Sequence, residues 1–103
     1  MTAARTDSFP QDFVPKTKLQ WRDVRHGLIR DFGGRCDYCK SPITAKTMHV
    51  DHAIPRCQGG TDHYANLHAS CPRCNMSKGG RSVWQWTDPE HYARSNPQPA
   101  NDA

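Results

Sequence analysis

The chain has 103 residues and a mean hydropathy of -0.90, and its 14 Lys and Arg residues against 10 Asp and Glu residues give a formal net charge of +4. This length fits one small domain, whose modest core often needs a metal ion or disulfides for stability. No apolar run is long enough to span a bilayer, and no secretory apolar segment begins the chain, so we expect an intracellular protein with reduced thiols.

The first predicted element is a helix that follows a flexible N-terminal arm over residues 1–15, which are polar and lack periodicity. Thr17 and Gln20 match a capping box at the helix start. Apolar residues then recur at helical spacing, and Gly33-Gly34 ends the helix. These apolar residues are Trp21, Val24, Leu28 and Phe32. Residues 16–35 also hold six basic and two acidic side chains, which form either a solvated face or a phosphate-binding surface.

The middle of the chain predicts two short strands and a second helix. Residues 48–54 and 67–70 are the expected strands, and a loop at 58–61 lies between them. Pro72 suits the first turn of a helix and Gly79-Gly80 suits its end.

The last part of the chain is expected to pack back on the domain and then to become disordered. Trp84, Trp86 and Tyr92 supply the apolar surface, and a helical turn is expected from Asp88 and Pro89. Together these patterns predict a single domain over residues 16–94 and a disordered tail over 95–103.

Two CxxC pairs, separated by 31 residues, are the strongest chemical signal in the chain. Four thiolates suit tetrahedral zinc, which would supply much of the folding free energy of so small a core. A redox-active pair and an iron–sulfur cluster are weaker alternatives, because no βαβ pattern is present and zinc is commoner at this spacing. The predicted zinc ligands are Cys36, Cys39, Cys71 and Cys74. Cys57 stands outside both pairs and is expected to be a small, partly buried thiol.

The segment "HVDHAIPRCQGGTDHYANLHASCPRCNMSKGG" resembles the HNH endonuclease family over about residues 35–80. Several motif elements occur in the family's order. They are Asp51-His52, Pro55, Gly59-Gly60-Thr61, Asn66-Leu67, the second CxxC pair with Asn75 after it, and Lys78-Gly79. The third motif position is Asn75, where the family name has His, so the chain resembles the HNN variant found in the HNH domains of CRISPR effector nucleases.

The resemblance implies an α+β fold, a small ββα-metal finger with two zinc knuckles and an N-terminal amphipathic helix. It also implies that His52 is the general base, that Asp51 and Asn75 hold a catalytic metal, and that Asn66 holds the hairpin loop and helps to orient the base. A carboxylate and an amide oxygen suit Mg²⁺ or Mn²⁺ better than zinc. Because adjacent side chains on a regular strand point to opposite faces, we expect the strand to bend at Asp51-His52.

The resemblance predicts a metal-dependent DNA endonuclease that nicks or cuts duplex DNA, in the cytoplasm of a bacterial or phage-infected cell. Basic side chains near the site are expected to contact DNA phosphates, and they are Lys78, Arg73, Arg81 and Arg56. One alternative is a zinc-stabilised nucleic-acid-binding module without catalysis. Another is a phage nuclease that depends on terminase subunits or acts as a homodimer. No membrane partner is expected.

Overall fold

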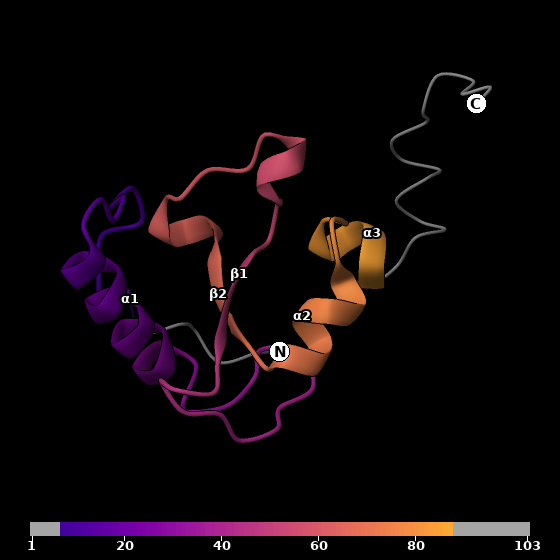
Figure 1. Cartoon of the computed structure of the whole chain (residues 1–103), viewed down its shortest axis with the longest axis horizontal. Coiled ribbons are helices and arrows are strands. Elements are labelled where there is room, and N and C mark those ends of the chain that lie inside the picture. The colour runs from indigo at the N-terminus through magenta and orange to yellow at the C-terminus, as the bar shows by residue number, and fades with distance from the viewer. Residues whose placement is uncertain (1–6, 88–103) are drawn as a thin grey trace.

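A computed structural model describes residues 7–87. A two-stranded antiparallel hairpin lies between helices, so the predicted α+β class is confirmed (Figure 1). The helices and strands are α1 (Lys18–Asp31), β1 (His49–His52), β2 (Leu67–Ser70), α2 (Pro72–Lys78) and α3 (Val83–Thr87). Short 3-10 turns at Arg56–Gln58 and Tyr64–Asn66 connect the two strands. No helix within these residues is long and apolar enough to cross a bilayer.

Helix α1 begins and ends where the sequence predicts. The Thr17 hydroxyl accepts a hydrogen bond from the Gln20 N–H at 3.1 Å, and the Gln20 side chain accepts from the Thr17 N–H at 3.2 Å, which completes the capping box. Gly33 and Gly34 have φ values of 67° and 71°, a conformation that favours glycine and stops the helix.

Residues 7–15 pack against the domain, so the prediction of a flexible arm does not hold for this segment. Phe9 stacks on Phe13 with ring centroids 4.9 Å apart and lies 5.1 Å from the Tyr64 ring. Gly27 on α1 makes room for Phe9, because a Cβ there would come within 2.7 Å of the Phe9 ring. The apolar area that the two phenylalanines bury offsets the entropy lost on ordering this polar segment. Residues 1–6 lie outside the described part of the chain.

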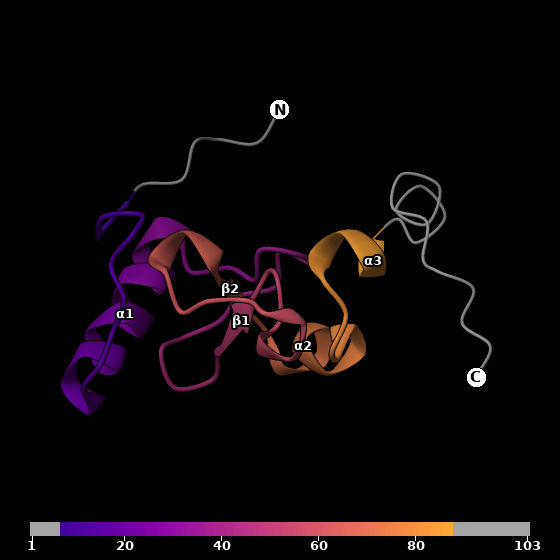
Figure 2. The same ribbon diagram turned by 90° about the horizontal axis from the view of Figure 1, so that it is seen from above.

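The hairpin is regular and brings the two halves of the motif together. His49 pairs with Ser70, Asp51 with His68, and His52 with Leu67. Strand β2 has the predicted bounds, whereas β1 is shorter than the predicted 48–54. Helix α1 contacts β2 and α2 contacts β1, so the helices flank the hairpin on opposite sides (Figures 1 and 2).

The loop after β1 is held by side-chain and backbone hydrogen bonds. The Asn66 side chain accepts from the Ile54 N–H at 2.9 Å and donates to the Ile54 and Thr61 carbonyls at 3.0 and 2.8 Å. Gly60 donates its N–H to the Pro55 carbonyl at 2.9 Å. These bonds fix the path of residues 54–66 between the strands.

Gly60→Ala is expected to lower the free energy of unfolding by about 1–3 kcal/mol, the usual cost of overpacking. The new Cβ would lie 1.6 Å from the Ile54 carbonyl oxygen, a backbone atom that cannot move alone. Chemical denaturation measures the loss. The control is Gly80→Ala, whose Cβ would meet only the Cys57 side chain, at 3.3 Å. Equal stability of both variants would contradict this account of the loop.

Helix α3, at the end of the described residues, packs against the domain through one of its two tryptophans. Trp86 meets the Tyr38 ring edge-on at 5.0 Å and donates its indole N–H to the Ser77 hydroxyl at 3.2 Å. Trp84, by contrast, is 54% exposed, so the prediction that it packs back on the domain was wrong. The predicted turn at Asp88-Pro89, Tyr92 and the predicted tail over 95–103 lie outside the described residues.

Candidate active site

The four paired cysteines converge on one point, as their spacing predicts. The four sulfur atoms all lie within 4.8 Å of one another, although they come from two turns far apart in sequence. Cys71 is the N-cap residue of α2, and its sulfur accepts from the Cys74 N–H at 3.4 Å. The Tyr38 N–H donates to the Cys36 sulfur, also at 3.4 Å. Four cysteine sulfurs are the number and type of ligand that a tetrahedral structural zinc ion takes.

The electrostatics of the cysteine cluster also favour a cation. The Ser41 hydroxyl and backbone N–H lower the pKa of Cys39 to about 6. Burial raises the pKa of Cys36, but backbone N–H donors outweigh burial and hold that pKa below its usual value. Burial and the neighbouring sulfurs raise the pKa of Cys74 well above the usual range. Four thiolates so close together would repel one another, so a bound dication would stabilise the fully ionised cluster.

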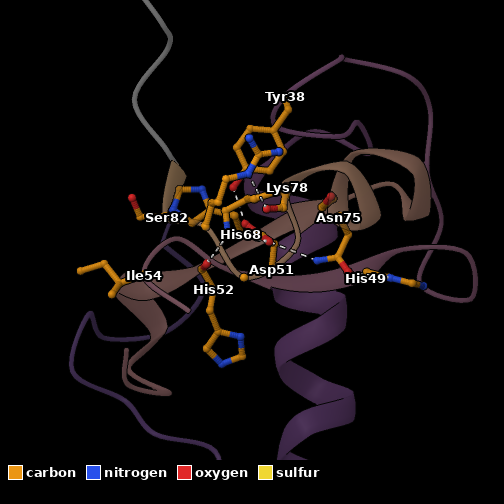
Figure 3. Close-up of polar contacts among 12 residues, drawn as sticks. Tyr38, His49, Asp51, His52, Ile54, His68, Asn75, Lys78 and Ser82 are labelled. Atoms are coloured by element: carbon orange, nitrogen blue, oxygen red, sulfur yellow. Dashed lines mark hydrogen bonds and ion pairs between the residues drawn. The ribbon is translucent and has the colours of Figure 1, made fainter. Parts of the chain in front are cut away.

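On the α2 side of β1, Asp51 is the centre of a buried polar cluster. The Asp51 residue is only 2% exposed, and its Oδ1 accepts from Lys78 Nζ at 3.2 Å and from Asn75 Nδ2 at 3.1 Å. The Tyr38 hydroxyl donates to the other carboxylate oxygen. Burial, then the carboxylate of Asp51, raise the pKa of Tyr38, so the phenol stays protonated as a donor. We call Tyr38, Asp51, Asn75 and Lys78 the metal-side cluster (Figure 3).

The metal-side cluster fits a hard dication through two oxygen donors. The Asn75 amide directs its nitrogen toward Asp51 and its oxygen toward His49 Nδ1, 3.3 Å away. Half a turn of the amide exchanges these two atoms and places Oδ1 beside the Asp51 carboxylate. Carboxylate and amide oxygens are ligands that Mg²⁺ and Mn²⁺ accept. Such an ion would share Asp51 Oδ1 with Lys78.

His52 lies on the other face of β1, and the predicted bend is absent. Strand pairing continues through His52 in regular register, and the Asp51 and His52 side chains point in opposite directions (Figure 3). The regular ladder keeps the ordinary alternation of a strand. Both residues nevertheless border one open pocket of about 180 Å³, together with Arg56, Asn75 and Lys78. The prediction of a bend was therefore wrong, and Asp51 and His52 both line this pocket from a regular strand.

A second polar cluster surrounds His52. Its Nε2 lies 2.8 Å from Asp62 Oδ1, and the same oxygen accepts from Arg56 Nε at 3.0 Å and from another guanidinium nitrogen at 2.8 Å. Burial raises the pKa of Asp62, but hydrogen bonds from His52 and Arg56 more than compensate and lower that pKa overall. We call His52, Arg56 and Asp62 the base-side cluster.

Asn66 holds the hairpin loop, as the family resemblance implies, whereas the sequence did not point to Asp62 as a partner of His52. Asn66 closes the loop between Ile54 and Thr61 and forms no described hydrogen bond with His52. Asp62 follows Thr61 directly, so this loop delivers its carboxylate to His52. The Gly59-Gly60 pair was the one sequence feature that could have indicated this, because a turn there brings the next residues back toward β1. Tyr38, which donates to Asp51 in the metal-side cluster, was also missed.

The four basic residues predicted to contact DNA have different environments. Lys78 is only 1% exposed, and its ammonium also donates to the His52 carbonyl at 2.7 Å. Lys78 nevertheless borders the open pocket, so its contact with a DNA phosphate remains a prediction. The guanidinium of Arg81 caps the end of α2 through the Ser77 and Lys78 carbonyls, and Arg56 pairs with Asp62. Arg73 is exposed on α2. Cys57 is exposed rather than partly buried, and it is separate from the cysteine cluster.

Comparison with known proteins gives a consistent family. Residues 36–81 match the model of the HNH endonuclease family. The chain is 37% identical over 90 residues to the CRISPR-associated endonuclease Cas9 of Corynebacterium diphtheriae. This alignment covers 82% of this chain and 8% of that protein. It is 34% identical over 64 residues to the Cas9 of Actinomyces naeslundii, which covers 61% of this chain and 6% of that protein.

A solved structure shares the fold as well. The crystal structure of the Type II-C Cas9 enzyme from Actinomyces naeslundii superposes with a TM-score of 0.58 and 30% identity, over 76% of this chain and 8% of that chain. The chain thus spans less than a tenth of the length of these relatives.

Proposed function

The chain belongs to the HNH endonuclease family through residues 36–81, and we propose that it hydrolyses phosphodiester bonds in DNA with the help of a divalent metal. One observation carries the proposal. Asp51 and Asn75, 24 positions apart in sequence, meet at 3.1 Å and border the same pocket as His52. A module that only binds nucleic acid needs no such convergence of a base with two oxygen ligands.

In the proposed reaction His52 is the general base. Its imidazole takes one proton from a water molecule, and the resulting hydroxide attacks phosphorus from the side opposite the 3′ oxygen. The bond between phosphorus and the 3′ oxygen breaks, and the electron pair leaves with that oxygen, which takes a proton from solvent. The products are a 5′-phosphate and a 3′-hydroxyl.

Asp51 and Asn75 would hold the catalytic Mg²⁺ or Mn²⁺. When bound, the ion supplies positive charge for the non-bridging and leaving oxygens. Tyr38 and Lys78 orient the Asp51 carboxylate by donating hydrogen bonds to it. Zinc on the four cysteines would fix the start of α2, which carries Asn75, without taking part in the chemistry. Arg73 is exposed on α2, and we retain it as a candidate contact for a DNA phosphate.

Plasmid nicking tests this function. Wild-type protein with Mg²⁺ or Mn²⁺ should convert supercoiled DNA to the open circular form, and EDTA should stop the conversion. His52→Ala should be slower by about 10²- to 10⁴-fold, the usual contribution of a general base. A DNA-binding measurement on both proteins completes the test. If wild type and variant bind DNA equally and neither nicks it under any metal condition, the chain is a binding module.

Dependence on a partner protein is the second part of the proposal. For this chain we propose that a partner raises a low intrinsic rate. A terminase subunit and a second copy of the chain remain the predicted partners, and the cytoplasm of a bacterial or phage-infected cell remains the predicted location.

A further inference from the structure

We propose that Asp62 is a positioning residue, which fixes His52 with the proton on Nε2 and so leaves Nδ1 as the atom that accepts a proton from water. The proposal deepens the function proposed above and rests on it for the role of His52. The contact itself, a carboxylate 2.8 Å from a ring nitrogen, is independent of that function.

The carboxylate decides which ring nitrogen carries the proton. An ionised carboxylate accepts hydrogen bonds and donates none, so the nitrogen that faces it must bear a hydrogen. In neutral imidazole the other nitrogen then holds the free electron pair. Asp62 therefore selects Nδ1 as the basic atom of His52.

Asp62 is itself held in place from two directions. Arg56 donates two hydrogen bonds to Oδ1, and the Arg56 guanidinium lies 5.9 Å from the Trp21 ring centroid, which links it to α1. The Asn66 amide ties Thr61, the preceding residue, to the loop. The Asp62 side chain is 28% exposed and that of His52 is 16% exposed, so water competes only partly for the bond.

The arrangement also keeps the two clusters separate. The His52 ring points away from Asp51 (Figure 3), and the described hydrogen bonds of Asp62 go to His52 and Arg56 rather than to the metal-side cluster. A carboxylate placed on the Asp51 side would compete for the metal instead. Asp62 can thus act on the base and leave the proposed metal ligands unchanged.

The test combines ring NMR with kinetics on the full, zinc-loaded chain. Long-range ¹H–¹⁵N correlation at about pH 8, where an ordinary imidazole is neutral, shows which nitrogen of each histidine is protonated, and His52→Ala identifies the His52 signals. Wild type should show a slowly exchanging proton on Nε2. In Asp62→Ala this proton should exchange with water and disappear from the spectrum.

The kinetic result should separate positioning from binding. Asp62→Ala should lower kcat about tenfold or more, a fraction of what a general base contributes, and leave KM for DNA unchanged. Asp62→Asn keeps an acceptor oxygen and should lose less, which also provides a second variant if Asp62→Ala folds poorly. Asp12→Ala, an exposed aspartate on the N-terminal segment, should match wild type in every measurement.

Two results would overturn the proposal. One is a wild-type spectrum with the His52 proton on Nδ1 and none on Nε2. The other is cleavage by Asp62→Ala at the wild-type rate or faster. An unchanged rate would mean that the Asp62 contact has no catalytic role, and a faster rate would mean that it is inhibitory. If the wild type fails to cleave DNA at all, the proposed function fails, whereas the NMR result still decides whether Asp62 fixes the ring.

Discussion

Cys71→Ser should abolish zinc binding and cooperative folding together. Structural zinc contributes about 10–16 kcal/mol of apparent binding free energy in zinc-finger peptides, whereas a whole domain has a net stability of about 5–15 kcal/mol. Loss of the ion should therefore unfold so small a core. Serine is a good N-cap residue, so α2 keeps its cap at this position and the substitution isolates the loss of the metal ligand. Zinc analysis of the purified protein and thermal melting measure the two effects.

Cys57→Ser is the matched control for this experiment. Cys57 is exposed and lies outside the cluster of four sulfurs, so its variant should keep about one zinc per chain and the wild-type melting curve. If Cys71→Ser keeps its zinc and melts at the same temperature as wild type, the four cysteines do not form the structural zinc site.

Asp51→Asn should abolish high-affinity binding of Mn²⁺ to the catalytic site. Loss of a residue that merely supports a metal ligand costs about 10- to 100-fold in affinity, so loss of the ligand carboxylate should exceed that range. Calorimetric titration of zinc-loaded protein with Mn²⁺ measures the change. Nicking should fall in parallel, because the charge on the phosphoryl oxygens would then go uncompensated.

The buried Lys78 complicates this variant and requires a companion. Asp51→Asn leaves the Lys78 ammonium buried without a carboxylate, a defect that costs about 3–5 kcal/mol. The double variant Asp51→Asn/Lys78→Met removes both charges, so it should regain stability but not metal affinity. Met76→Ala, at an exposed α2 position beside Asn75, should bind Mn²⁺ like wild type. Wild-type Mn²⁺ affinity in the double variant would exclude Asp51 as a ligand.

Features with strong local signals were predicted correctly from the sequence. The capping box at Thr17 and the glycines after Phe32 set the limits of α1. Strand β2 and the start of α2 at Pro72 also lie where the sequence predicts. Each depends on a few neighbouring residues with a definite backbone preference. The CxxC spacing, together with the family resemblance, also placed Asn75 beside Asp51.

Features that depend on tertiary contacts were not predicted. Phe9 packs because Gly27, 18 positions away, leaves space for its ring, and a polar segment gives no local sign of this. Lys78 is buried by its pairing with Asp51, whereas lysine is ordinarily exposed. Asp62 reaches His52 only because the loop from Ile54 to Asn66 folds back. The expected bend in β1 was an unnecessary assumption, since two faces of a regular strand can border one pocket.

In the proposed mechanism β1 divides the work, with metal binding on the Asp51 face and proton transfer on the His52 face. The most direct test measures Mn²⁺ affinity and DNA cleavage on the same preparations of His52→Ala and Asp51→Asn/Lys78→Met. The account predicts that His52→Ala binds Mn²⁺ with wild-type affinity but cleaves at least about 10²-fold more slowly, and that the double variant loses both properties. Loss of Mn²⁺ binding in His52→Ala, to the same degree as in the double variant, would contradict the division.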